Sequence, residues 1–152
     1  MTSKQAKLRK ITAKLLTRKG VCESQLNKFI ALFPDGVEPT RELCVAHAND
    51  FNFSWAAQYL LSPPARKAYS EAVWPTRKAY YDVVGPASDV YDIALALAYN
   101  VCNATCVPSY NVYEDAIAAA RKVYYDAVCQ AHKAYDEGIA AAFYEAWTGE
   151  NQ

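Results

Sequence analysis

The second half of the chain repeats every eleven residues, and this repeat constrains the fold more than any other feature. Six tyrosines mark the unit, with Cys102 at the same position where one is missing: Tyr69, Tyr80, Tyr91, Tyr113, Tyr124 and Tyr135. From residue 65 to residue 152 the units follow one another without insertion or deletion. Eleven residues make three helical turns at about 3.67 residues per turn, so each unit returns its side chains to nearly the same face. The repeat therefore predicts helix.

Within each unit the apolar residues fall on one arc of the helix. Positions one, four, five, eight and nine are mostly Ala, Ala or Val, Tyr, Ala, and Val or Ile. This arc predicts a buried stripe that contains the six tyrosines. Oppositely charged residues four apart lie on the other side and predict a solvated face: Lys67 with Glu71, Lys78 with Asp82, Lys122 with Asp126, and Lys133 with Glu137.

Proline recurs at the eleventh position of the unit, at Pro75, Pro86 and Pro108. Because proline lacks an N–H and its ring clashes with the preceding turn, we expect these residues to end or kink the helix. The glycine before Pro86 makes that position the stronger breaker, since Gly85 is able to take a left-handed cap conformation.

The repeat and its prolines together predict three helices, over 63–84, 87–103 and 109–147, with Ser62 as the first N-cap. The middle helix carries Ile93, Leu95 and Leu97 in place of charges and proline, so we expect it to be the most buried. Alanine-rich stripes let helices approach closely. We therefore expect an all-α fold in which 63–152 forms a long antiparallel helical hairpin or three-helix bundle.

Residues 1–62 predict a small basic helical domain. Residues 1–19 contain seven basic side chains and no acid, with leucines and isoleucine on one helical face, which predicts a basic amphipathic helix. Shorter helices are expected over 23–32, 40–48 and 54–61, the first ending at the turn 33–36. Seven large side chains form the expected core: Phe29, Phe33, Leu43, Phe51, Phe53, Trp55 and Leu60.

Composition excludes several classes of protein. Sixteen basic and sixteen acidic residues give a formal net charge of zero, so no global field draws the chain to nucleic acid or to an anionic membrane. The five glycines form no phosphate-binding string, and we expect no cofactor. The longest uncharged apolar run, 93–99, is far shorter than the roughly 20 residues that span a bilayer.

The five cysteines match neither a disulfide framework nor a zinc spacing. Without a secretory signal, this predicts a cytoplasmic protein.

A resemblance to other proteins suggests the cellular environment in which this protein acts. The string from Cys22 through Leu32–Gly36, Glu42–Cys44, His47–Ala48 and Trp55–Leu61, followed by Ala-Arg-Lys-Ala-Tyr repeats, resembles small uncharacterised proteins of bacteriophages and mobile elements. The resemblance covers most of the chain. It implies the cytoplasm of a bacterial host cell and interference with a host system, including a defence system, and it implies no site residue.

Catalytic and metal-binding groups are scarce. The chain has two histidines, and the pair Cys44–His47 on one short helix suits packing as well as nucleophilic chemistry. Cys102 and Cys106 lie four apart and could ligate a metal with His132 or Cys129. They occupy apolar positions of the repeat, which favours core packing. We predict no catalytic residue, no metal site and no enzymatic activity.

The residues predicted to bind a partner protein are Tyr81, Tyr125, Trp74 and Tyr110. Tyr81 and Tyr125 occupy position six, which lies about 100° from the tyrosines of the stripe and beside the charges. Tyrosine and tryptophan give large contact areas at low entropic cost, as is typical of interfaces. The sequence thus predicts an interaction module that clamps or occludes a host protein, with self-association of the arm as a further possibility.

Two alternative functions remain open. The basic segment could bind nucleic acid through Lys4, Lys7, Arg9, Lys10, Lys14, Arg18 and Lys19. The proline-punctuated amphipathic repeats could instead bind a lipid surface, although their apolar arc is mostly alanine and lacks a cationic border.

Overall fold

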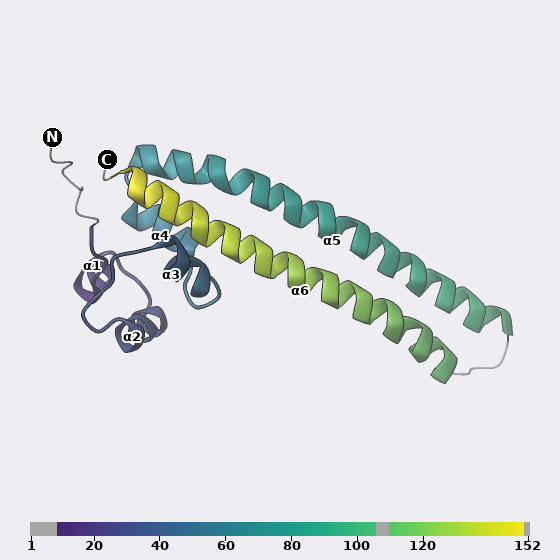
Figure 1. Cartoon of the computed structure of the whole chain (residues 1–152). Helices are drawn as coiled ribbons and strands as arrows, with labels where there is room; N and C mark the ends of the chain where they lie inside the picture. The colour runs from purple at the N-terminus through teal and green to yellow at the C-terminus, as the bar shows by residue number, and fades with distance from the viewer. Residues whose placement is uncertain (1–8, 106–109, 151–152) are drawn as a thin grey trace. The chain divides into compact units, whose positions relative to one another are not determined.

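A computed structural model of the chain describes residues 9–105 and 110–150. It shows an all-α fold. Four short helices come first: α1 (Ala13–Arg18), α2 (Glu23–Leu32), α3 (Arg41–Ala46) and α4 (Phe53–Leu60). Two long helices follow, α5 (Pro63–Thr105) and α6 (Tyr110–Gly149). They run in opposite directions as a hairpin (Figure 1). Of the two arrangements expected for residues 63–152, the antiparallel hairpin is confirmed.

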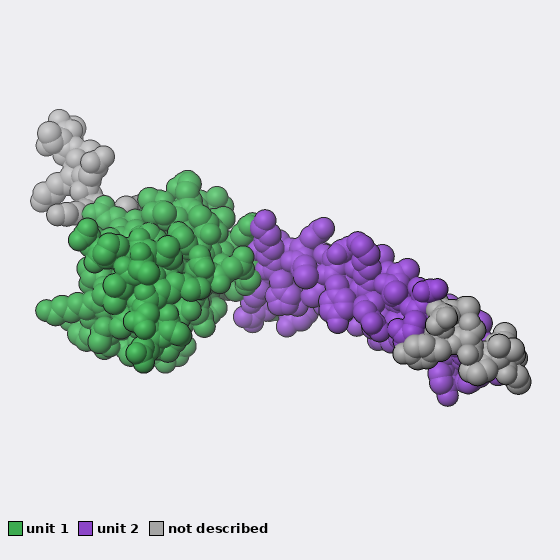
Figure 2. Space-filling view, turned by 90° about the horizontal axis from the view of Figure 1, so that it is seen from below, with its two compact units in different colours: residues 1–76, 136–152 green, residues 77–135 purple. Residues whose placement is uncertain are grey.

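By their contacts the residues form two compact units, which Figure 2 colours separately. Unit 1 comprises residues 1–76 and 136–152, and unit 2 comprises residues 77–135. Unit 1 thus holds the short helices with the adjoining ends of α5 and α6, whereas unit 2 is made of the two long helices alone. The division expected between residues 62 and 63 stays a prediction.

The short helices lie close to their predicted ranges. α2 spans 23–32 as expected, and the turn after it contains Gly36 at φ 77°, a conformation that favours glycine. Thr40 and Asn52 cap α3 and α4, accepting hydrogen bonds from the amides of Leu43 and Trp55.

The basic helix predicted over 1–19 is wrong in its extent, since α1 begins only at Ala13. Ile11 is extended and exchanges two backbone hydrogen bonds of 2.8 Å with Val37. The hydroxyl of Thr12 then caps α1 by accepting from the Leu15 amide. Leu15 and Leu16 of the predicted apolar face are buried within this shorter helix, and Ile11 is buried ahead of it. Tertiary pairing of Ile11 has overridden local helix propensity.

The predicted helix break at Gly85–Pro86 is also wrong, because α5 continues through it, as it does through Pro75, which the helix predicted over 63–84 already contained. An internal proline removes one backbone hydrogen bond and costs about 3 kcal/mol. Both prolines are exposed, so water can solvate the carbonyl that each leaves without a donor. Packing of the buried stripe on both sides of each proline stabilises α5 by more than the proline costs. α5 ends at Thr105 and α6 begins at Tyr110, close to the limits 103 and 109 predicted around Pro108, which itself falls outside the described residues.

The tyrosines of the repeat set the register of the hairpin in unit 2. The rings of Tyr80 and Tyr135 have their centroids 5.5 Å apart, and those of Tyr91 and Tyr124 stack at 5.4 Å. Moving eleven residues along α5 therefore moves the contact eleven residues back along α6. All six tyrosines are half-buried. The prediction that they share one packed face is confirmed.

The buried stripe is narrower than the apolar arc of the sequence. Positions one, five and nine are buried or half-buried wherever the structure describes them. Position four was predicted to be buried, but its valines are exposed: Val90 by 61%, Val101 by 54% and Val123 by 65%. One partner helix covers only part of an arc this wide, which is the physical reason for the error.

The segment 87–103, predicted to be the most buried, is also largely exposed. Ile93 and Leu97 are each 60% exposed, while Leu95 is half-buried and Ala98 is buried. Ile93 and Leu97 occupy the positions that carry charge and proline in other units, outside the apolar arc, and α6 does not cover them. On the solvated side, predicted charge pairs form at Lys67–Glu71, Lys78–Asp82 and Lys122–Asp126, with N–O distances of 3.9, 2.6 and 2.8 Å.

The core of unit 1 combines the short helices with the end of α6. Phe29 and Leu60 are buried, and most of the other predicted core residues pack around them. The largest fully buried side chains are Phe143 and Trp147, exposed by 1% and 0%. Phe53 meets Phe143 at 5.5 Å between ring centroids, and the Arg9 guanidinium lies 5.7 Å above the Trp147 ring. The core of the first 62 residues is thus completed by α6.

Candidate functional site

Two of the predicted partner-binding residues, Tyr81 and Tyr125, are exposed on unit 2. Tyr81 is 63% exposed and its ring meets Tyr80 edge-on at 5.3 Å. Tyr125 is 56% exposed and its ring meets Tyr124 edge-on at 5.6 Å. Each exposed ring is therefore supported by a half-buried tyrosine of the stripe, which limits the conformations open to it before binding.

Tyr81 and Tyr125 lie on the same side of the hairpin. Two antiparallel helices are related by a two-fold axis perpendicular to their common plane, so equivalent repeat positions on them face the same way. Position six therefore points to one side, together with position two, which carries Tyr99, Arg121 and His132. We call these five residues the tyrosine face. Tyr81 and Tyr125 belong to separate ring groups within it, one around Tyr80 and one around Tyr124.

Polar contacts hold the inner tyrosines of this face. The Tyr80 hydroxyl lies 3.0 Å from His132 Nε2, and the two rings meet at 4.9 Å. A side-chain hydrogen bond with Tyr91 raises the pKa of Arg121. His132, expected from the sequence to be a surface residue, is exposed and forms part of this tyrosine support.

The other two residues predicted to bind a partner, Trp74 and Tyr110, are not part of this face. Trp74 belongs to unit 1 and is 65% exposed. Tyr110 is the first residue of α6, and its side chain lies outside the described residues.

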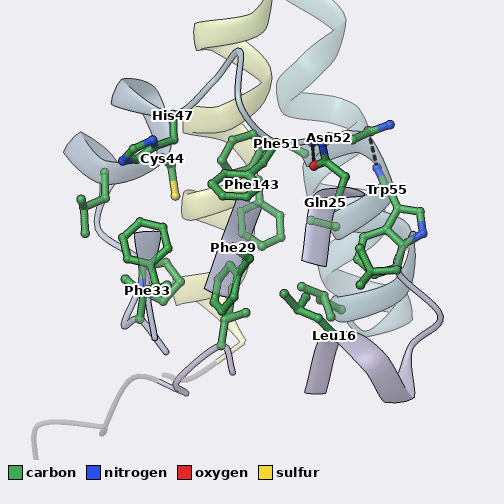
Figure 3. A pocket seen from close by; sticks show the side chains of 18 of the residues that line it. Leu16, Gln25, Phe29, Phe33, Cys44, His47, Phe51, Asn52, Trp55 and Phe143 are labelled. Carbon is green, nitrogen blue, oxygen red and sulfur yellow. Dashed lines mark hydrogen bonds between the residues drawn. The ribbon is translucent and has the colours of Figure 1, made fainter. Parts of the chain in front are cut away.

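Unit 1 contains an apolar pocket that sequence reasoning did not find. Its volume is about 260 Å³, and its walls come from the four short helices and from α6. The rings of Phe29, Phe33, Phe51 and Phe143 line it (Figure 3). A cavity of roughly 150 Å³ accepts one benzene ring. The pocket therefore has room for an apolar group of one to two rings.

The polar groups around this pocket are already paired with one another. Gln25 donates to the Asp50 carbonyl at 3.2 Å and accepts from the Asn52 amide at 3.3 Å. His47 Nδ1 lies 2.9 Å from Asp50 Oδ2, and Lys28 Nζ lies 3.2 Å from Asp50 Oδ1. Hydrogen bonds from His47 and Lys28 lower the pKa of Asp50. The pocket thus offers apolar contact and no charge awaiting a partner.

Cys44 and His47, weighed from the sequence as a nucleophile–base pair, both pack within the apolar part of unit 1. His47 hydrogen-bonds Asp50, and its ring packs against Phe33 at 5.5 Å. Burial raises the pKa of the Cys44 thiol to about 12. A thiol that stays protonated at neutral pH is a poor nucleophile.

Cys22 contrasts with Cys44 and gives a test of this arrangement. Cys22 is exposed, and a hydrogen bond with Ser24 lowers the pKa of its thiol. At pH 8 we expect maleimide to modify Cys22 at least 100-fold faster than Cys44, since a pKa of about 12 leaves roughly one thiolate in 10⁴. Peptide mass mapping over time measures both rates. In denaturant the two rates should converge, and fast labelling of Cys44 in the folded protein would contradict the buried thiol.

Metal sites and membrane-spanning helices were both searched for in the described part of the chain. No group of three or more His, Cys, Asp or Glu residues there could hold a metal ion, and Cys106 lies outside it. None of the helices in residues 9–105 and 110–150 is long and apolar enough to cross a bilayer.

The basic residues predicted to contact nucleic acid are only partly described. Lys4 and Lys7 lie outside the described residues. Lys10, Lys14, Arg18 and Lys19 are exposed, whereas Arg9, also exposed, lies over Trp147.

The comparisons with known proteins add no information about the site. No protein family model, no curated protein and no solved structure matches the chain. The resemblance to bacteriophage and mobile-element proteins therefore stays a prediction.

Proposed function

We propose that this protein is a non-enzymatic interaction module that binds a partner protein through the tyrosine face of unit 2. The observation that carries the proposal is the pair of exposed tyrosines, Tyr81 and Tyr125, each supported by the ring of an inner tyrosine. Rings held in place before binding lose little entropy when a partner covers them. Their apolar area and hydroxyl groups give both contact and hydrogen bonds.

The composition of the tyrosine face supports a protein as the ligand. Tyrosine and arginine are enriched in protein–protein interfaces, and binding energy concentrates in a few such side chains. The face also carries Arg121, which donates hydrogen bonds, and His132, whose ring nitrogens donate or accept them. The predicted bacterial setting suggests a host protein, including a component of a defence system, as the partner.

Removing both exposed tyrosines tests the proposal. If each contributes about 2 kcal/mol, the Tyr81→Ala, Tyr125→Ala double variant should lose at least 100-fold in affinity for the partner. Affinity capture from a bacterial lysate with quantitative mass spectrometry identifies the proteins that the wild type enriches, and titration of the purified partner measures the loss.

A matched control is Tyr59→Ala, which removes a tyrosine of unit 1 that is 42% exposed. It should bind the partner like the wild type. Equal enrichment by the double variant would contradict a role for the tyrosine face. Salt-sensitive binding of duplex DNA without a protein partner would favour the nucleic-acid alternative.

A further inference from the structure

The opposite side of the hairpin carries an uncovered aliphatic surface. Six large side chains of unit 2 form it: Val83, Val90, Ile93, Leu97 and Val101 on α5, and Val123 on α6. Each is between 47% and 65% exposed. We call this set the aliphatic face. None of the six is a tyrosine or a charged residue, and Asp82 and Asp126 lie at its edge, at the repeat position of Ile93.

The helix geometry places these residues on one side of the hairpin. Val90 and Val123 each precede one of the two tyrosines whose rings stack at 5.4 Å, Tyr91 and Tyr124. They therefore lie at the same level of the hairpin and, as equivalent repeat positions on antiparallel helices, face the same way. The other four residues of the aliphatic face on α5 are separated from Val90 or from one another by three, four or seven residues. These spacings keep them on the same side of α5 as Val90.

The spacing along α5 is that of a helix-packing seam. Ala79, Val83, Pro86, Val90, Ile93 and Leu97 follow one another at steps of four, three, four, three and four residues. Such a pattern presents an apolar seam to another helix in coiled coils and helical bundles. The wide apolar arc of the repeat thus has two parts, one covered by the other arm of the hairpin and one left for another helix.

The size of the aliphatic face is close to what a stable dimer requires. The exposed area of its six large side chains is on the order of 600 Å², and the partners in a standard interface each bury about 800 Å². Ala79, Pro86 and Ala134 are also exposed beside it. Apolar patches larger than a few hundred Å² on soluble proteins mark interaction sites.

The seam is complementary to itself, which identifies the occupant. Ala79 and Val83, which lie before Val90, are each smaller than the residue at the matching distance after it, Val101 and Leu97 respectively. A second seam laid antiparallel about Val90 sets Val83 opposite Leu97 and Ala79 opposite Val101. In both pairs the smaller side chain then meets the larger one, as close packing requires. A two-fold symmetric interface repeats each such contact.

We propose that the aliphatic face binds the same face of a second copy of the chain, forming a four-helix bundle. The two-fold axis passes beside Val90 and Val123, so that each of these valines meets its own counterpart. This inference goes beyond the proposed function because the tyrosine face is left free on both outer sides of the bundle. Loss of dimers and loss of partner binding are therefore separable by different variants.

The molar mass in solution tests the proposal. Light scattering of the wild type at micromolar concentrations should give twice the 16.9 kDa mass of the chain. The Val90→Glu, Val123→Glu variant should give the mass of one chain, since it places four carboxylates around the two-fold axis. The matched control is Tyr99→Glu, which changes a residue as exposed as Val90, at 61%, on the tyrosine face. It should remain a dimer.

Circular dichroism of the same samples shows whether each variant keeps its helix content, which exposed glutamates on a helix should preserve. A second measurement does not depend on charged substitutions. Val90→Cys should be linked to its counterpart by a short bis-maleimide in high yield, whereas Tyr99→Cys should link no better than the native cysteines of the wild type.

A monomeric wild type, a dimeric Val90→Glu, Val123→Glu variant, or equal linking of the two cysteine variants would each overturn the proposal. So would a monomer that floats with phosphatidylcholine–phosphatidylglycerol vesicles, since a lipid surface would then be the occupant of the face.

Discussion

Replacing Trp147 by alanine is expected to destabilise the protein by about 3–5 kcal/mol, because the residue fills the centre of unit 1. Its side chain is 0% exposed, and Phe143 stacks on it at 5.8 Å between centroids. Alanine would leave a cavity, and the helices around it cannot move close enough together to fill it. For a chain of this length the loss should lower Tm by roughly 10 °C or more.

The chain provides a control of the same residue type. Trp74 is 65% exposed, so Trp74→Ala should change the free energy of unfolding by no more than about 0.5 kcal/mol. Urea unfolding followed by circular dichroism measures both variants. Equal effects of the two substitutions would show that α6 does not complete the core of unit 1.

Adding a single methyl group at Gly138 is expected to destabilise unit 1 by about 1–3 kcal/mol. A Cβ built at Gly138 would overlap the Thr76 Cγ2 methyl and would lie 2.8 Å from the Thr76 hydroxyl oxygen. Threonine is branched at Cβ and has little freedom to turn away. The helices α5 and α6 would have to separate at this point, which loosens the contacts on either side.

Gly85→Ala is the matched control and should change the free energy of unfolding by less than about 1 kcal/mol. Apart from its chain neighbours, an added Cβ at Gly85 meets nothing within 4 Å, and the residue lies inside α5. Helix propensity favours alanine there by about 0.5–1 kcal/mol, and Pro86 offsets this gain because its ring disfavours the helical conformation of a preceding residue that has a Cβ. The Thr76→Ala, Gly138→Ala double variant should recover most of the loss, as a thermodynamic cycle of the unfolding free energies would show. Additive effects in that cycle would contradict the close approach of Thr76 and Gly138.

The repeat predicted the hairpin well because its period carries long-range information. Tyrosines eleven residues apart return to one face of a helix, and two such helices joined by a short connection pack antiparallel with their repeats in register. Local rules also placed Thr40 and Ser62 at the starts of helices, since capping depends on a few neighbouring residues.

The remaining features depend on contacts that no local pattern contains. The prolines at 75 and 86 look like helix breaks when only their own turn is considered, but the packing on both sides sustains α5. Ile11 left the predicted first helix to pair with Val37, which lies 26 residues further along the chain.

The candidate site was predictable only in part, for the same reason. The exposure of Tyr81 and Tyr125 follows from their place in the repeat, whereas the exposed valines of position four do not, because a wide apolar arc does not state how many helices cover it. The pocket of unit 1 was also missed, since Phe143 reaches it from the far end of the sequence.

The burial of Phe143 and Trp147 against the first helices also imposes an order on biosynthesis. A ribosome releases residues 9–62 long before it has made residue 147, so the emerging segment exposes Phe29, Leu60 and their neighbours to solvent until translation is almost complete. Contacts between such distant positions close slowly. During that interval the nascent chain is a natural client for chaperones that shield apolar segments.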